Sequence, residues 1–156
     1  MKMFKGNQID RRSFLKRASI ATIASVSLAG CSGGGGNGNG GGTKNFGGWM
    51  ENANNYTGVV DETGKSTVTV KVGAGSTNLA FGPAAVKVSK GTKIEWKWTG
   101  KGGMHNVHAK EGASFKSDLY SSAGVHFSHT FNESGTVKYQ CDPHASAGMK
   151  GVVVVE

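Results

Sequence analysis

The sequence has little cysteine and little proline, with two residues of each among 156. Two cysteines cannot build a framework of several disulfides, so a folded domain here must depend on a hydrophobic core. No apolar stretch reaches the ~20 residues that a bilayer-spanning helix needs. At this length the chain has room for one ordinary domain with extensions, which excludes large enzymes with several cofactors.

Acidic residues are also scarce, with ten against 18 basic residues and a formal net charge of +8. Six of the basic residues and one of the acidic ones lie within residues 1–30, so residues 31–156 have a net charge of only +3. A basic composition can indicate nucleic-acid binding. Because most of this excess lies in the first 30 residues, we expect no nucleic-acid partner.

Residues 1–30 have the pattern of an export signal. Arg11 and Arg12 form a twin-arginine motif, and an apolar run of signal-peptide length follows at 20–30. The run ends in LAGC, which resembles a lipobox, in which cleavage before Cys31 leaves a lipid on its sulfur. We therefore predict a lipoprotein signal peptide and a protein held by lipidated Cys31 at the outer face of the cell membrane. The alternative is an amphipathic helix with a chance cysteine.

Eight of the ten residues at 33–42 are glycine, so residues 31–48 are predicted to be a flexible Gly/Asn-rich tether. A random coil of about 17 residues spans about 20 Å, enough to hold a domain off a lipid surface. The remaining residues, 49–156, form the predicted folded domain, which is large enough to bury a core.

Alternating apolar and polar residues predict several short strands in this domain, at 67–72, 85–88, 94–98, 125–131, 136–140 and 151–156. Glycine-containing turns separate them. Many short strands with frequent turns indicate an all-β fold, an antiparallel β-sandwich or barrel. Residues 49–61 fit either a short helix or an irregular flap, and residues 111–124 fit a long loop or a short helical turn.

The domain contains one thiol, two imidazoles and one thioether at suggestive positions. Cys141, His144 and Met149 lie on a short segment before the last predicted strand, and His105 follows a glycine-rich turn. A thiolate and two imidazoles with a weak axial thioether are the ligands of a type 1 copper centre. We therefore predict one copper ion that cycles between Cu(I) and Cu(II).

Other readings of these residues are weaker. Zinc could bind His105, Cys141 and His144, but methionine is not a usual zinc ligand. Cys141 and His144 could form a thiol nucleophile and its base, but they share one tight loop and no oxyanion-hole signature accompanies them. A thiolate-bridged dinuclear copper centre needs a second thiolate, and five histidines cannot supply the clusters of a multicopper enzyme.

The segment CDPHASAGM with the upstream triplet HNV resembles plastocyanin-type cupredoxins. The strings FGPAAV, WKWTG, HTF and GMKG are similar to halocyanins, the membrane-attached blue copper proteins, and the resemblance covers residues 49–156. It implies an eight-stranded Greek-key sandwich with copper near one end. It also implies that the His144 ring edge reaches the surface through an apolar patch and that Asn106 braces the ligand loop. Unlike plastocyanins, this chain has Gln140 rather than tyrosine before the cysteine.

Two further residues are predicted to shape the ligand loop, because Pro143 restricts Asp142 to extended conformations. We expect His108, His126 and His129 to be structural or surface residues, with the last two on opposite faces of a strand.

The predicted function is one-electron transfer by a monomer, not enzymatic catalysis. The resemblance implies membrane redox complexes as electron donor and acceptor, with a respiratory chain as the expected setting. The alternatives are a copper storage or delivery protein that uses the same ligands, and a metal-free adhesive sandwich.

Overall fold

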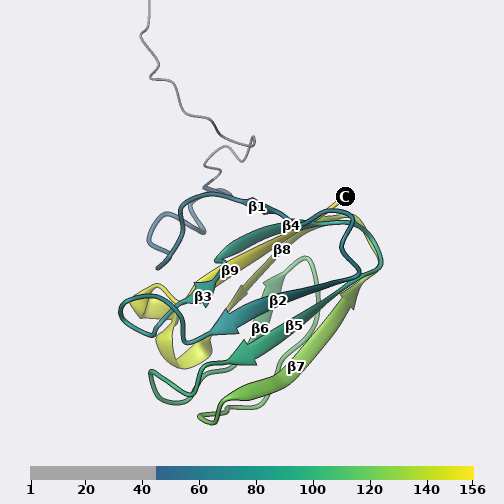
Figure 1. The fold of residues 1–156 in the computed structure, drawn as a ribbon. Helices are drawn as coiled ribbons and strands as arrows, with labels where there is room; N and C mark the ends of the chain where they lie inside the picture. Colours follow the sequence, from purple (N-terminus) through teal and green to yellow (C-terminus); the bar gives the residue numbers. More distant parts are fainter. Residues whose placement is uncertain (1–44) are drawn as a thin grey trace, which may run out of the picture. The chain divides into compact units, whose positions relative to one another are not determined.

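The computed structural model describes residues 45–156, which form a sandwich of two packed β-sheets (Figure 1). The predicted signal peptide, Cys31 and residues 31–44 of the predicted tether lie outside the described residues. In the part that is described, no helix has both the length and the hydrophobicity needed to cross a bilayer.

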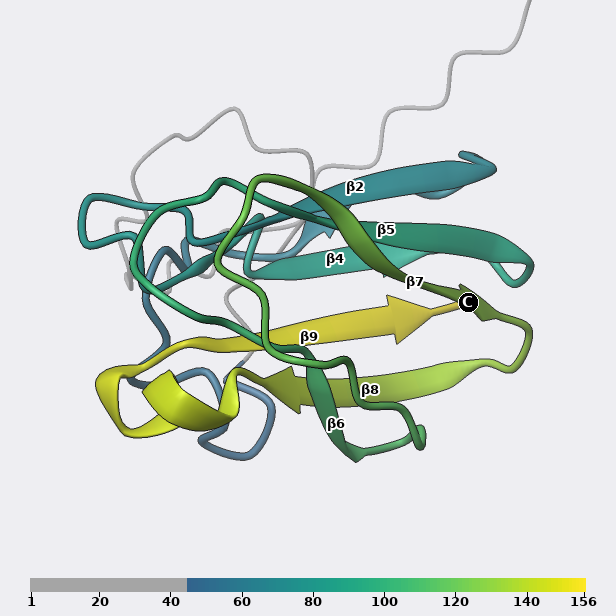
Figure 2. The ribbon, with the colours of Figure 1, turned by 90° about the horizontal axis from the view of Figure 1, so that it is seen from below.

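Two sheets make up the sandwich, and Figure 2 shows them from below. The five-stranded sheet has the order β1 (Val60–Asp61), β4 (Ala85–Val88), β9 (Lys150–Val155), β8 (Gly135–Gln140) and β6 (His108–Glu111). The four-stranded sheet has the order β3 (Phe81–Gly82), β2 (Thr67–Val72), β5 (Thr92–Trp98) and β7 (Gly124–Phe131).

The predicted all-β sandwich is confirmed, and each predicted strand is present. The sheets are mixed rather than antiparallel throughout, since β1–β4, β4–β9 and β2–β5 are parallel pairs. Strands β2 and β5 are joined through a strand of the other sheet rather than by a hairpin, and such crossovers allow parallel pairing. The described residues contain nine strands; β1, β3 and β6 have only two to four residues, too few to show alternation.

The two ambiguous segments are irregular. Residues 45–59 form a series of turns rather than a helix, and residues 112–123 form a loop. Isolated bridges tie this loop to the rest of the domain, between His105 and Tyr120 and between His108 and Lys116.

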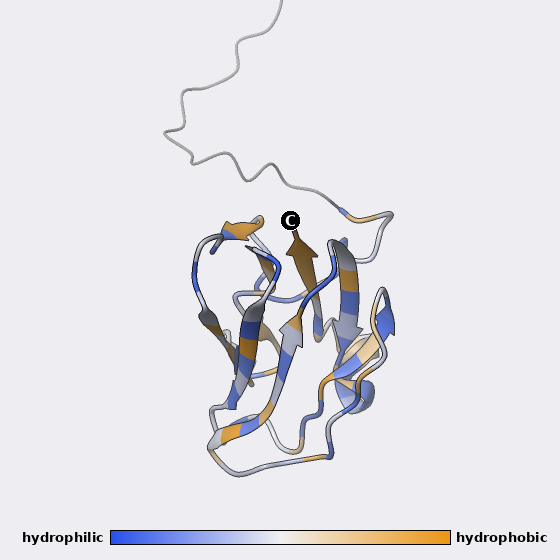
Figure 3. Cartoon of the chain, turned by 90° about the vertical axis from the view of Figure 1, so that its right-hand side faces the viewer, coloured by the Kyte–Doolittle hydropathy of each residue, from blue (hydrophilic) through white to orange (hydrophobic). Residues whose placement is uncertain are grey.

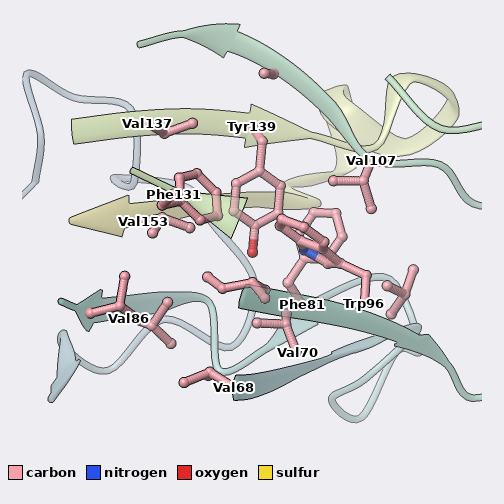
Figure 4. Close-up of a cluster of buried hydrophobic side chains, with 14 of the residues drawn as sticks. Val68, Val70, Phe81, Val86, Trp96, Val107, Phe131, Val137, Tyr139 and Val153 are labelled. Carbon is pink, nitrogen blue, oxygen red and sulfur yellow. The ribbon is translucent and has the colours of Figure 1, made fainter. Parts of the chain in front are cut away.

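Alternation along the strands places the core between the sheets. In β2, Val68, Val70 and Val72 are buried and the intervening residues are exposed, and Figure 3 shows the same mixing of hydrophobic and hydrophilic residues along the strands. In Figure 4, Tyr139 of β8 extends across the core toward Phe81 and Trp96. Its ring centroid lies 4.7 Å from that of Phe81 and 5.5 Å from that of Trp96. Burial raises the pKa of Tyr139 well above its ordinary value, so its phenol stays protonated.

A second, smaller core lies on the outer face of β4 and β9. Residues 46–56, which we call the N-terminal flap, cover this face through Met50, which is 1% exposed. Met50 packs with Ala84, Ala85 and Val152, while the opposite face of β9 belongs to the main core. Strand β9 is therefore buried on both faces, which explains its run of four valines.

A β-bulge corrects the expectation for two histidines. Phe127 pairs with Trp96 and Val125 with Lys97, which leaves His126 as an extra residue in β7. The bulge turns its ring inward, where it stacks on Tyr120 with centroids 4.3 Å apart. His129 also packs inward, 4.9 Å from Phe115. The two histidines are thus not on opposite faces, because the prediction assumed an unbroken strand.

We predict that Gly151→Ala strongly destabilises the domain. Gly151 pairs with Tyr139 across β8 and β9, and a Cβ at this position would overlap the tyrosine ring. The ring is confined by Phe81 and Trp96, so it cannot move away. Overpacking of this kind costs about 1–3 kcal/mol, and urea denaturation followed by tryptophan fluorescence measures it. The control is Thr136→Ala at an exposed position of β8, for which a change within about 0.5 kcal/mol is expected. Equal effects of the two substitutions would contradict the argument.

Candidate metal centre

Three segments meet at one end of the sandwich. His105 lies in the connection between β5 and β6, and Cys141 directly follows β8. His144 belongs to η1 (Asp142–Ala147), a short 3₁₀ helix with Pro143 at its start. Met149 directly precedes β9, after Gly148 has turned the chain with a φ of 91°.

The two imidazoles and the thiol converge on a point. The Nδ1 atoms of His105 and His144 are 3.1 Å apart, and the Cys141 Sγ lies 3.7 Å and 3.5 Å from them. The centre of such a triangle is about 2 Å from each corner, close to the length of a metal–nitrogen bond. Within residues 45–156 these three residues are the one group of histidine, cysteine and acidic side chains arranged to hold a metal ion. The donor set therefore fits a metal bound by one sulfur and two nitrogens.

A backbone carbonyl fixes the tautomer of His105. The Nε2–H donates to the carbonyl oxygen of Lys101 at 2.8 Å, which leaves the lone pair of Nδ1 directed at the site. The ring is 1% exposed, and burial lowers the pKa of His105, an effect that the Lys101 carbonyl opposes and His144 reinforces. A buried neutral imidazole is the form that binds a metal.

Cys141 is fully buried, and burial raises the pKa of its thiol. The backbone N–H groups of Asn106 and His144 oppose part of this shift. A thiolate at this position therefore needs a cation to compensate its charge, and a soft metal that replaces the proton supplies one.

Met149 is also fully buried and belongs to the same core cluster as Cys141. Its backbone N–H donates to the His144 carbonyl at 3.1 Å, and its carbonyl accepts from the Cys141 N–H at 3.0 Å. The residue is thus fixed on both sides by two of the other predicted ligands.

Asn106 and Asp142 form the contact that a bracing role requires. The Asn106 amide donates to the Asp142 carboxylate at 3.0 Å, and its carbonyl oxygen accepts from the Asp142 backbone N–H at 2.8 Å. These two bonds join the segment that follows His105 to the residue that follows Cys141. Each of these hydrogen bonds contributes about 1 kcal/mol to the free energy of unfolding.

Sequence reasoning missed two partners of Asp142. His108 Nδ1 lies 3.0 Å from both carboxylate oxygens, and the Gln140 amide donates to one of them at 3.2 Å. Gln140 could have been found, because it points outward in β8 two residues before Asp142. Tyr139, its inward neighbour, is fully buried in the core and forms no part of the outer surface. His108 and the Lys101 carbonyl carried no recognisable signal.

The carboxyl group of Asp142 is kept ionised by these partners. Burial alone would raise its pKa, but hydrogen bonds from Asn106, Gln140 and His108 outweigh burial and hold the pKa well below its ordinary value. In the unfolded chain the pKa returns to about 3.9. Asp142 therefore stabilises the fold at pH values above about 4, and this contribution is lost as pH falls below that value.

We predict that Asp142→Asn makes the copper-free protein less stable near neutral pH and less sensitive to acid. The difference in unfolding free energy between wild type and variant should narrow as pH falls from about 4 toward the much lower pKa of folded Asp142, because the unfolded wild-type chain then binds a proton that the folded chain does not. Urea denaturation at a series of pH values measures it. A difference that stays constant with pH would show that the charge of Asp142 does not contribute.

Comparisons with known proteins agree with this site. The family model described as copper binding proteins of the plastocyanin/azurin family matches residues 68–156. Halocyanin from Natronomonas pharaonis is 42% identical, over 95% of this chain and 98% of the halocyanin. Plastocyanin from Daucus carota is 38% identical, over 55% of this chain and 97% of the plastocyanin. The solved structure of oxidised plastocyanin from Dryopteris crassirhizoma has a TM-score of 0.48 and 28% identity, covering 57% of this chain and 100% of that one. Halocyanin and plastocyanin are electron carriers rather than enzymes, and the chain therefore belongs with them to the plastocyanin/azurin family of copper-binding proteins, the cupredoxins.

Proposed function

We propose that this protein transfers single electrons through a type 1 copper centre held by His105, Cys141, His144 and Met149. The observation that supports it most directly is the triangle of two imidazole nitrogens and one thiol sulfur, with edges of 3.1, 3.5 and 3.7 Å. Copper, when bound, supplies a one-electron couple between Cu(II) and Cu(I). His144 and Met149 are each joined to Cys141 by a main-chain hydrogen bond, and His105 contacts the Cys141 sulfur through its side chain.

The chain's own contribution is rigidity and exclusion of water. The Lys101 carbonyl holds the ring of His105, and Asn106 holds the segment after Cys141. Cys141 and Met149 are inaccessible to solvent. A pocket whose donors are already in place changes little between oxidation states, and a small structural change favours rapid electron transfer.

The surface near His144 supports a route for electrons. His144 is partly exposed, whereas His105 is buried. Met104 and Leu119, next to the site, are 51% and 44% exposed, and Leu119 lines a surface hollow together with Pro143. Exposed apolar residues of this kind commonly mark interaction surfaces. Redox partners are therefore proposed to dock over His144.

The cellular setting is a separate part of the proposal. The twin-arginine motif, the apolar run and Cys31 support export and a lipid anchor at the outer face of the cell membrane. The likeness to halocyanin over nearly the full length of both chains is consistent with this setting. Membrane redox complexes, such as those of a respiratory chain, are the proposed partners of a monomeric carrier.

The first test is the colour of the copper-loaded full chain. We expect an intense blue Cu(II) form that bleaches reversibly on reduction. Cys141→Ser should abolish the colour, while the copper-free variant keeps the fold and still shows an unfolding transition. Visible absorption and circular dichroism measure the two. Retained colour in Cys141→Ser would exclude this thiolate as the ligand.

A matched control and a kinetic measurement sharpen this test. Cys31→Ser removes the other cysteine of the chain and should leave the blue colour unchanged. Rapid electron self-exchange together with slow copper release supports a carrier. Fast release of copper to an acceptor, with slow self-exchange, would support storage or delivery instead.

The anchor has its own test. Cys31→Ser should move the exported, blue protein from the membrane fraction to the soluble fraction, because the acceptor sulfur for the lipid is lost. Immunoblots of separated fractions measure it, with Cys141→Ser as the variant that should stay with the membrane. An unchanged distribution of Cys31→Ser would contradict lipid anchoring and leave the copper assignment intact.

A further inference from the structure

The N-terminal flap, residues 46–56, lies beside the loop that contains the predicted ligands His144 and Met149. In Figures 1 and 2 the flap and the 3₁₀ helix η1 are neighbours at the same end of the sandwich, although about 90 residues separate them in the sequence. The hydrophobic cluster around Met50 anchors the flap on the five-stranded sheet. The flap precedes residue 68, where the family model begins, so it lies outside the part of the chain that defines the family.

Asn54 connects the flap to the backbone just before Met149. Its backbone N–H donates to the carbonyl of Gly148 at 2.8 Å, and its side-chain amide donates to the carbonyl of Ala147 at 2.8 Å. The same amide donates its other hydrogen to the carbonyl of Leu79 at 2.9 Å. One side chain therefore joins the Met149 loop to the connection between β2 and β3.

That connection is itself next to the His105 segment. A Cβ on Gly102 would overlap the carbonyl oxygen of Asn78, the neighbour of Leu79, so the two backbones are in close contact. The Lys101 carbonyl that orients His105 lies one residue earlier. Asn54 thus links, through Leu79, the two parts of the chain that hold His105 and Met149.

Two more contacts fix the loop from the same side. Gly148 lies so close to the flap that a Cβ there would overlap the carbonyl oxygen of Asn52. After Met149, the indole N–H of Trp49 donates to the carbonyl of Gly151 at 3.1 Å. The flap therefore holds the backbone on both sides of Met149.

We propose that Asn54 is a positioning residue for the copper centre, which fixes the backbone before Met149 and so sets how strongly the thioether acts on the metal. The axial thioether of a type 1 site is a weak ligand that tunes the reduction potential. Its distance from the metal is set by the protein rather than by the bond itself, so a contact that holds its backbone affects the potential. This inference rests on the proposed function.

The test compares Asn54→Ala with Asn55→Ala in the copper-loaded full chain. Asn55 is the neighbouring flap residue, but its amide donates to the Phe81 carbonyl and not to the ligand loop. Asn55 also has a φ of 61°, so alanine there adds backbone strain and disturbs the flap at least as much. A loosened thioether stabilises Cu(II) less, so Asn54→Ala should raise the reduction potential and alter the EPR line shape. Asn55→Ala should change neither.

Trp49→Phe provides a second variant if Asn54→Ala does not fold. It keeps an aromatic ring in the flap and removes the N–H that bonds Gly151, so it should shift the potential and line shape in the same way. Wild-type values in both Asn54→Ala and Trp49→Phe would overturn the inference. Equal changes in Asn54→Ala and Asn55→Ala would also overturn it, because they would reflect general destabilisation. A wild-type protein without a blue, reversible couple would instead refute the proposed function.

Discussion

The copper loop depends on one main-chain contact, the hydrogen bond from the Cys141 N–H to the Met149 carbonyl. It continues the ladder between β8 and β9 by one step beyond Gln140 and Lys150. The seven residues between Cys141 and Met149 are thereby closed into a ring whose two end residues are fully buried. Because core packing sets both strands, the sandwich fixes where the loop begins at Cys141 and ends at Met149, and the N-terminal flap adds contacts to the backbone around Met149.

The sequence contained enough information for the sandwich and for the grouping of His105, Cys141 and His144, while Met149 stays a predicted ligand. The valines of β2 and the tryptophans of β5 alternate clearly, and the Cys141–His144–Met149 spacing indicates a specific chemistry. The hydrogen bonds that orient the ligands were harder to predict from the sequence. The Lys101 carbonyl that selects the tautomer of His105 is a main-chain group present in every residue, so no side-chain pattern reports it.

The wrong prediction for the faces of His126 and His129 and the open assignment of the flap have similar physical causes. A β-bulge at His126 breaks the two-residue period on which face assignment depends, and it arises from register with β5 rather than from local preference. The flap could not be assigned from sequence, because its turns are stabilised by distant residues. Met50 is held by Ala84 and Val152, and Asn54 by carbonyls 25 and 93 residues away along the chain. Tertiary contacts of this length leave no local periodicity.

The unequal exposure of the two imidazoles limits how the carrier can work. His105 is buried behind the Lys101 carbonyl, so only His144 offers a short path between the centre and the outside. Under the proposed function, the reducing and the oxidising partner must use this same small area. The protein cannot bind both partners at once and pass an electron from one to the other. It must dissociate from the reducing partner before it binds the oxidising partner. The overall rate of electron transfer is then limited by how quickly the protein dissociates from each partner. This favours short-lived, weak complexes over tight association.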